Sequence, residues 1–339
     1  MKYDAIVIGA GPAGSSAAEK LSMTGHKTLM IDPCVGKKVC AGVLTARYLR
    51  KYGIDDSFVE KKLKGVKISF KGISAKIEYK KAVEYSINRG SYDSFNLDQA
   101  LGAGALLIKD VVLSLDENDV CVEIRTHKER IRADYAILAS GVSDISRLSG
   151  GVKEFAYCVQ QKKYENSGDY FEMDLLANGY SWTVPKKDHI LSGTTSLANY
   201  PDIPGERGLI PVNGPVKTTF SKRTLLAGDA AGFVSPFEGE GIYYAKRSGE
   251  LAASVISDVI SGDTTTEVYE KYWRKEFDFS TLAAISRLLN NDIILEAFVR
   301  EIRDNEKFNK VVENILTKEY GELRAEYISS LIKKLVNYR

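Results

Sequence analysis

A glycine-rich turn near the start of the chain constrains the fold more than any other feature. In AIVIGAGPAGSSAAEKLSM, Gly9, Gly11 and Gly14 stand between a strand-like apolar run and a helix-like, alanine-rich run. The first glycine permits a tight turn, the second lets the backbone approach a pyrophosphate, and the third lets the helix pack on the strand. Asp32 ends the next apolar run, KTLMID, where a carboxylate can accept hydrogen bonds from ribose hydroxyls. This stretch predicts a βαβ unit that binds a dinucleotide, without separating FAD from NAD.

A second segment, RTLLAGDAAGFVSPFEGEGIYYAKRSGELAAS, favours FAD. A strand-like run leads into Gly228 and Asp229, and Gly239 and Gly241 precede a helix-like run that continues to Ile260. The segment resembles the second FAD fingerprint of flavoproteins with the p-hydroxybenzoate hydroxylase fold. In those proteins the aspartate holds a ribityl hydroxyl, and the helix points its N-terminus at the flavin ring. The alternative for Asp229 is an ordinary helix N-cap, which leaves the surrounding glycines unexplained.

Four stretches of the chain together resemble the geranylgeranyl reductase family, which reduces double bonds of prenyl chains in archaeal lipids, quinones or chlorophyll precursors. They are VIGAGPAGSSAA, the segment from GDAAG to GEGIYYA, KVCAGVL (residues 38–44) and NRGSYD (residues 88–93). The third is similar to the family's Lys-x-Cys-(Ala)-Gly turn under the flavin, and the fourth to its Arg-x-x-aromatic-Asp. The resemblance covers roughly residues 1–255.

The resemblance implies which residues contact FAD. Arg89 is expected against the phosphate region, and its alternative is an exposed ion pair with Asp93, which would contribute little. The complete set implied for the cofactor is Gly9, Gly11, Ala13, Gly14, Asp32, Cys40, Ala41, Gly42, Arg89, Gly141, Gly228, Asp229, Pro236, Gly239, Gly241 and Ile242.

The stretch NGYSWTVP carries the expected substrate site. In a strand, alternate side chains share a face, so Tyr180, Trp182 and Val184 stand together. Such a row is most often ordinary core. It falls, however, where the resembled family has its substrate-pocket motif, which implies that these residues line a prenyl tunnel.

Two catalytic roles follow from that reading. Reduction of an isolated double bond develops positive charge on carbon, which the aromatic faces of Tyr180 and Trp182 can stabilise. Cys40 is the candidate proton donor because of its place in the motif, and the alternative is a buried structural thiol.

Composition excludes several other classes of protein. The 339 residues are 44% hydrophobic and 27% charged, and no apolar run approaches the roughly 20 residues that cross a bilayer. We therefore expect a cytoplasmic protein, with a peripheral contact at the inner membrane face left open. Four scattered cysteines and three histidines form no metal-binding pattern, so no metal is expected, and all three histidines are expected at the surface.

Positive charge gathers in one segment, where eight lysines lie between Lys61 and Lys81. KGVKISFKGISAKIEYK alternates around Lys71-Gly72, which predicts a hairpin with one apolar and one basic face. The basic face is interpreted as a solvated surface, or as a docking site for an anionic membrane or an acidic redox carrier. Nucleic acid is not expected, because no aromatic residues interleave the lysines.

The fold class that follows is α/β, with a Rossmann-like FAD-binding domain of the p-hydroxybenzoate hydroxylase (GR2) type and an inserted antiparallel sheet. We expect residues 1–60, 85–147 and 215–265 to form the discontinuous FAD-binding domain, 61–84 and 148–214 the substrate sheet, and 266–339 a helical C-terminal region. Residues 201–215, PDIPGERGLIPVNGP, are predicted as a turn-rich crossing.

The predicted function is FAD-dependent reduction of C=C bonds in geranylgeranyl or other prenyl chains. Its partners would be the prenyl lipid and an electron donor, either a ferredoxin-like carrier or NAD(P)H. One alternative is a flavin-dependent monooxygenase or halogenase of the same fold, and another is a non-catalytic, flavin-bearing isoprenoid-binding protein.

Overall fold

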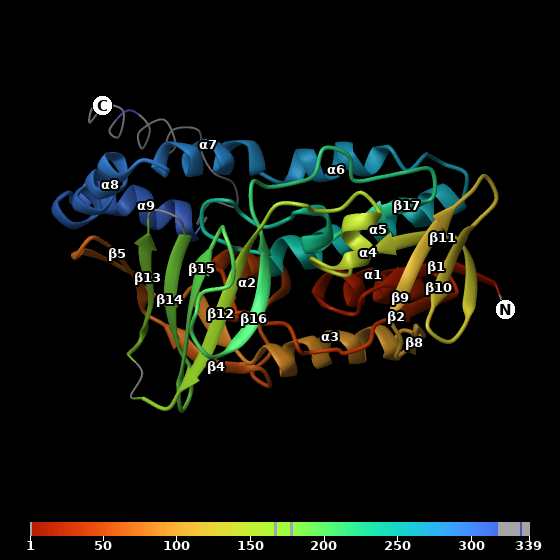
Figure 1. The fold of residues 1–339 in the computed structure, drawn as a ribbon, viewed down its shortest axis with the longest axis horizontal. Helices are drawn as coiled ribbons and strands as arrows, with labels where there is room; N and C mark the ends of the chain where they lie inside the picture. Colours follow the sequence, from red (N-terminus) through yellow and green to blue (C-terminus); the bar gives the residue numbers. More distant parts are fainter. Residues whose placement is uncertain (1, 166–167, 177–178, 318–332, 334–339) are drawn as a thin grey trace.

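A mixed sheet of seven strands forms the first half of the molecule (Figure 1). The computed structural model describes residues 2–165, 168–176, 179–317 and 333. Pairing within this sheet is parallel except around β10, which is antiparallel to both of its neighbours. In spatial order its strands are β8 (Leu106–Ile108), β2 (Thr28–Ile31), β1 (Lys2–Ile8), β11 (Arg130–Leu138), β10 (Val122–Thr126) and β9 (Val112–Glu117), with β17 (Thr224–Leu226) paired to β11.

The βαβ prediction for the first thirty residues is confirmed. Helix α1 (Pro12–Met23) joins β1 to β2, with Pro12 in its first turn, where a missing N–H costs nothing. Gly25 follows the helix with φ +86°, a left-handed conformation that glycine adopts without strain. The sequence therefore specifies both ends of this helix.

Helix α5 (Ile242–Ile260) packs directly on α1. The contact is close because small residues meet there: a methyl group added at Gly249 would lie 2.1 Å from the carbonyl oxygen of Ala13. Gly228, just after β17, lies on the same alanine, since its added methyl would be 3.0 Å from the Ala13 Cβ. Ala13 is thus enclosed by two glycines from the distant second fingerprint.

A second seven-stranded sheet stands beside the first (Figure 1). It is antiparallel as expected, apart from one parallel junction where β5 pairs with β13. In spatial order its strands are β16 (Glu206–Pro211), β12 (Phe155–Lys163), β15 (Ile190–Ser196), β14 (Gly179–Pro185), β13 (Tyr170–Leu176), β5 (Gly65–Phe70) and β6 (Ile73–Glu78). The prediction that residues 201–215 form only a turn-rich crossing is wrong, because β16 lies within them and pairs with β12.

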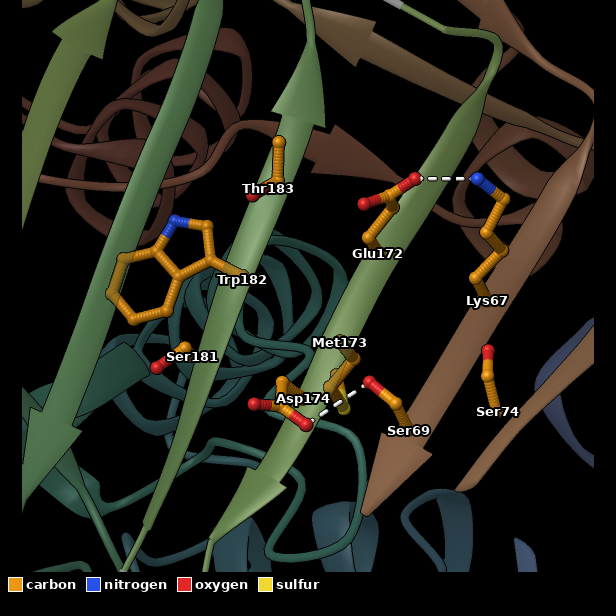
Figure 2. Close-up of a pocket in the computed structure, with 9 residues that line it drawn as sticks. All are labelled: Lys67, Ser69, Ser74, Glu172, Met173, Asp174, Ser181, Trp182 and Thr183. Carbon is orange, nitrogen blue, oxygen red and sulfur yellow. Dashed lines mark hydrogen bonds and ion pairs between the residues drawn. The ribbon is translucent and has the colours of Figure 1, made fainter. Parts of the chain in front are cut away.

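The predicted hairpin is confirmed as β5 and β6. Phe70 pairs with Ile73, so Lys71 and Gly72 form a two-residue loop, and both have positive φ (+47° and +80°). Carboxylates pair with lysines of the hairpin: Lys67 with Glu172, Lys71 with Asp292 and Lys76 with Glu78. Beside the first pair, the Ser69 hydroxyl donates to Asp174 at 3.0 Å (Figure 2). The first pair, Ser69 and Asp174 line a polar depression of about 320 Å³ on the outer face of the sheet.

Small elements join the two sheets. A three-stranded sheet has the order β3-β7-β4. Its strands are β3 (Val43–Leu44), β4 (Val59–Leu63) and β7 (Glu84–Ile87). Helix α2 (Ala46–Tyr52) follows β3 and α3 (Arg89–Gly102) follows β7, whereas α4 (Asp144–Leu148) contacts β9 of the first sheet. A short 3₁₀ helix, Gly228–Ala231, follows β17.

Further helices lie along the top of the molecule in Figure 1, where the first of them packs on α5 and the later ones cover the second sheet. They are α6 (Val268–Glu276), α7 (Phe279–Leu289), α8 (Asp292–Asp304) and α9 (Glu306–Thr317). Residues of α7, α8 and α9 share a buried core with the apolar face of the β5–β6 hairpin, including Phe298 and Phe70, each 2% exposed. Within the described ranges no helix is long and apolar enough to cross a membrane. The three-part division of the chain into domains stays a prediction.

Replacing Gly249 by alanine is expected to destabilise the protein by about 1–3 kcal/mol, because the new methyl group would overlap the Ala13 carbonyl. The matched control is Gly102→Ala in α3, where an added methyl meets nothing within 4 Å. That change should be neutral or stabilise by up to about 1 kcal/mol through helix propensity. Urea unfolding of both variants measures the difference, and equal midpoints would contradict the close packing of α1 on α5.

Candidate active site

One cavity of about 860 Å³ brings the two fingerprints and the aromatic strand together. Its lining includes Pro12 at the start of α1, Asp229 after β17 and Gly241 at the start of α5. Tyr180 and Trp182 of β14 line the same cavity. Segments separated by more than 200 residues therefore meet around one space.

The three glycines of the first motif have the three environments that a nucleotide site requires. Methyl groups at Gly9 and Gly14 would lie 2.4 Å and 1.8 Å from backbone carbonyl oxygens, whereas one at Gly11 would meet nothing within 4 Å. Asp32 accepts a hydrogen bond from the Ala10 N–H at 2.7 Å, which holds its carboxylate beside this turn. The open side of the turn at Gly11 leaves room for a phosphate group.

The second fingerprint lies across from the first. Asp229 forms an ion pair with Lys38 and is not the N-cap of the short 3₁₀ helix, whose cap is Ala227. Among the described residues no side chain caps the N-terminus of α1 at Gly11 or that of α5 at Gly241. Pro236, Gly239, Gly241 and Ile242 all line the cavity. Two positive helix ends therefore face the same space, an arrangement that suits an anionic ligand.

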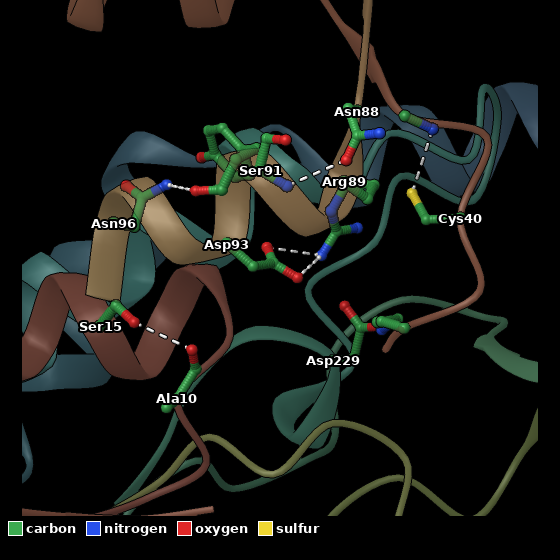
Figure 3. A network of polar contacts seen from close by, with 12 residues as sticks. Ala10, Ser15, Cys40, Asn88, Arg89, Ser91, Asp93, Asn96 and Asp229 are labelled. Carbon is green, nitrogen blue, oxygen red and sulfur yellow. Dashed lines mark hydrogen bonds and ion pairs between the residues drawn. The ribbon is translucent and has the colours of Figure 1, made fainter. Parts of the chain in front are cut away.

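The turn at Cys40, Ala41 and Gly42 forms the next part of the wall. Gly42 has φ +66°, and its N–H donates to the Cys40 Sγ at 3.4 Å (Figure 3). Gly141 is near this region as well, since its added methyl would lie 3.9 Å from the Lys38 Nζ.

Arg89 lies beside this turn at the start of α3. Its guanidinium donates to both oxygens of Asp93 at 3.0 Å, and both side chains are buried (Figure 3). The alternative of an exposed ion pair is therefore wrong. Burial opposes the charge of Arg89, but Cys40 and Asp93 raise its pKa above the ordinary value. The Arg89 Nε is buried without a hydrogen-bond partner among the described residues, and Arg89 lines the cavity.

Tyr180 and Trp182 form another part of the cavity wall. Their ring centroids are 5.7 Å apart, and the indole lies over Gly193, where an added methyl would be 2.2 Å from it. The Tyr180 hydroxyl reaches Gly239, since a methyl there would be 3.0 Å from that oxygen. Val184 is on the same face of the strand but is fully buried. It packs on Cys158 and Trp182 and, unlike them, does not line the cavity.

The residues present fit a flavin nucleotide. The open turn at Gly11, the uncapped helix ends and the unpartnered Arg89 Nε suit phosphates and ring oxygens, and Asp229 supplies a carboxylate beside the α5 terminus. Of the residues predicted for the cofactor, the cavity wall contains Cys40, Ala41, Gly42, Arg89, Asp229, Pro236, Gly239, Gly241 and Ile242. Gly9, Gly11, Ala13, Gly14, Asp32, Gly141 and Gly228 are not part of this wall.

Sequence reasoning missed several polar residues near this site. Lys38 was noted only as the first residue of the KVCAGVL motif, with no role assigned to it. It pairs with Asp229, 191 positions away in the sequence. Lys186 directly follows the aromatic strand and is fully buried. His189 was predicted at the surface, but it is only 7% exposed; its ring lies 6.2 Å from that of Tyr164, and its Nδ1 is 2.6 Å from Asp188.

The chain matches known proteins along most of its length. The family model described as pyridine nucleotide-disulphide oxidoreductase matches residues 3–172, which is half of the chain. A digeranylgeranylglycerophospholipid reductase of Methanococcus aeolicus is 28% identical over 326 residues, covering 81% of this chain and 83% of that protein. One of Methanocaldococcus jannaschii is 27% identical and covers 95% and 97%.

The chain belongs to this oxidoreductase family, and within it to the geranylgeranyl reductases. Their fold also agrees. The crystal structure of a geranylgeranyl bacteriochlorophyll reductase-like protein from Thermoplasma acidophilum superposes with a TM-score of 0.81 at 24% identity, covering 100% of this chain and 99% of the other. A flavin-dependent brominase shares the fold with a TM-score of 0.76 at 16% identity. As a geranylgeranyl reductase family member, the chain is a flavin-dependent oxidoreductase.

Asp229→Ala is expected to weaken FAD binding by about 1–3 kcal/mol, since it removes a charged hydrogen-bond acceptor beside the α5 terminus. Asp263→Ala, at an exposed position after α5, is the control and should bind as the parent does. Titration of flavin-free protein with FAD, followed by fluorescence quenching, measures both affinities. If the two variants bound FAD equally well, the second fingerprint would have no part in the site.

Proposed function

We propose that this flavin-dependent reductase binds FAD and adds hydrogen across C=C bonds of geranylgeranyl or related prenyl chains, as in the archaeal-type lipids named by its relatives. The observation that carries the proposal is the single cavity shared by the fingerprint residues and the aromatic strand. When bound and reduced, FAD supplies the hydride.

The far part of the cavity supports an apolar, elongated substrate. Beyond Tyr180 and Trp182 it is lined by Val66, Ile68 and Phe171 of the second sheet. Leu289, Leu295, Phe298 and Leu316 from the C-terminal helices complete this part of the wall. Apolar side chains from both layers exclude water from a bound chain, and they would hold a double bond near the fingerprint residues.

The aromatic pair would act on charge as well as shape. An isolated double bond that accepts hydride first develops positive charge on its other carbon, and a nearby indole or phenol face stabilises that charge. The indole Nε1 of Trp182 is buried without a partner among the described residues, so packing holds the ring, which lies on Gly193 of β15 and contacts Tyr180 and Cys158. The position of the π face therefore depends on β15.

A proton must reach the second carbon, and the cavity wall offers two cysteines, Cys40 and Cys158, and two tyrosines, Tyr157 and Tyr180. Burial raises the pKa of Cys158 to about 11, and burial likewise raises the pKa of Tyr180 above its ordinary value. Cys158 is packed against Val39 and Ala41 at 1% exposure, whereas Cys40 is half-buried beside Arg89. Cys40 is thus the better placed donor.

The electron donor would be a ferredoxin-like carrier or NAD(P)H, which docks transiently. The three lysines of the β5–β6 hairpin are each paired with a carboxylate, which makes a solvated surface a better interpretation than a docking site. The pairs are Lys67–Glu172, Lys71–Asp292 and Lys76–Glu78. A peripheral membrane contact would bring the lipid to the cavity, and exposed Leu197 on its rim is available for such a contact.

Anaerobic incubation with dithionite and digeranylgeranylglycerol phospholipid, followed by mass spectrometry, tests the proposed reaction. Gains of two mass units per reduced bond are expected. A monooxygenase or halogenase would instead require oxygen and give oxygenated or halogenated products. A flavin-bearing binding protein would retain the lipid with its mass unchanged.

Trp182→Leu is expected to slow lipid-dependent reoxidation of the flavin by about 5- to 30-fold, with FAD content nearly intact, because an apolar wall remains but the π face is lost. Gly193→Ala should act in the same direction by displacing the indole. Tyr170→Leu, on the outer face of the same sheet, is the control. Stopped-flow absorbance gives the rates, and equal turnover per bound FAD in Trp182→Leu and the parent would leave Trp182 a packing residue.

Replacing Lys67 and Lys71 together with their partners Glu172 and Asp292 by alanine is expected to change reduction by an acidic carrier less than about twofold, because each ion pair contributes almost no net charge to the surface. The measurement is the rate of flavin reduction by reduced ferredoxin at low and high ionic strength. A loss of ten-fold or more in the variant at low salt would assign the hairpin to carrier docking after all.

A further inference from the structure

Lys186 is a fully buried lysine just behind the cavity wall. It follows Pro185, the last residue of the aromatic strand β14. Its ammonium donates to the carbonyl oxygen of Ile87 at 2.7 Å and to that of Gly42 at 3.3 Å. A carboxylate oxygen of Glu60 lies 3.5 Å away. The three hydrogens of the ammonium thus have three acceptors, each from a different segment.

These contacts converge on the turn that carries Cys40. Gly42 also accepts from the Ile87 N–H at 2.8 Å, and a methyl at Gly42 would lie 2.7 Å from the Ile87 oxygen and 3.1 Å from the Lys186 Nζ. On the other side, the Ser86 hydroxyl donates to the Pro185 carbonyl at 2.6 Å. Lys186 therefore joins the aromatic strand, the cysteine turn and the base of α3 at one point.

The charges around Lys186 come from several elements. Glu60 of β4 favours the ammonium, Cys40 of the turn favours it as well, and Arg89 of α3 opposes it. On its own segment, Lys187 and Asp188 are exposed and His189 is buried. Two buried cations thus lie close to Cys40: Arg89 in the cavity wall and Lys186 behind it.

We propose that Lys186 is a positioning residue, whose buried ammonium holds the Cys40–Gly42 turn in place and puts a positive charge behind the flavin-facing wall. The inference rests on the proposed function for its FAD. A positive charge at this place stabilises the reduced, more negative flavin relative to the oxidised form. The buried charge would therefore raise the flavin midpoint potential.

The charge should be lost within an accessible range of pH. Burial lowers the pKa of Lys186 from 10.5 to about 8, although Glu60 partly opposes the shift. Below about pH 8 the folded and unfolded chains both carry the proton, so the cost of burying the charge is fully present. Between about pH 8 and 10.5 only the unfolded chain binds it, so the stability contributed by this group rises with pH.

The test compares Lys186→Met with the parent by redox titration of the FAD-loaded proteins at pH 7 and pH 9.5. At pH 7 the variant should favour oxidised over reduced flavin by roughly tenfold more than the parent, which is about 30 mV in midpoint potential. At pH 9.5 the two potentials should converge, because the parent has lost its charge. Lys186→Arg stays charged at both pH values. Its midpoint potential should therefore exceed that of Lys186→Met by about the same amount at pH 7 and at pH 9.5.

A second readout uses the flavin-free proteins. The melting temperature of the parent should rise relative to that of Lys186→Met between pH 7 and pH 9.5, following the sign given above. Lys187→Met, at the exposed neighbouring position, is the matched control and should follow the parent in both measurements.

Glu60→Gln keeps the proposal testable if Lys186→Met folds poorly. Removing this carboxylate should move the fall in the parent's potential to lower pH, because Glu60 helps to retain the proton on Lys186. A potential difference between parent and Lys186→Met that persists at pH 9.5, or none at pH 7, overturns the proposal. No prenyl substrate enters these measurements, so their failure would leave the proposed reaction standing, and failure of lipid reduction would leave them unaffected.

Discussion

The contact between Ala13 of α1 and Gly249 of α5 determines where the remaining parts of the site can lie. Because a methyl at Gly249 would meet the Ala13 carbonyl at 2.1 Å, the two helices pack with backbone almost touching backbone. Gly228 adds a second close approach to the same alanine. Two helices held this closely can present both N-termini to one cavity, and their dipoles add there. A bulkier contact would separate the two halves of the nucleotide site.

The sequence predicted this arrangement best where local geometry and chemistry coincide. Gly9, Gly14 and Gly228 could be recognised because each backbone approach excludes a side chain, and that requirement is visible in sequence. The alternation of Tyr180, Trp182 and Val184 was confirmed as one face, since strand periodicity is also local. The same pattern could not predict that the Val184 side chain does not line the cavity, because its burial depends on packing against the neighbouring strands β12 and β15.

Features that depend on distant partners were missed. The pairing of Lys38 with Asp229, the burial of Lys186 and the burial of His189 each require residues from separate segments. Residues 206–211 of β16 were predicted as turns because prolines and glycines, which are typical of turns, flank a short apolar stretch. This stretch is a strand because it pairs with β12, which the local sequence does not show. The helical period of the C-terminal region was visible, but not the face of the sheet that it covers.

The parallel junction between β5 and β13 has a consequence for how the molecule forms. Residues 65–70 must wait for residues 170–174 before their open edge is paired, and the apolar face of the hairpin must wait for α8 and α9. Asn309 reaches back to the Lys76 carbonyl across 233 positions of sequence. Contacts this remote in sequence form slowly, and the hairpin's apolar face stays exposed on the ribosome until nearly the whole chain has emerged. The part of the cavity wall that comes from α8 and α9 therefore forms only after these late segments have been made.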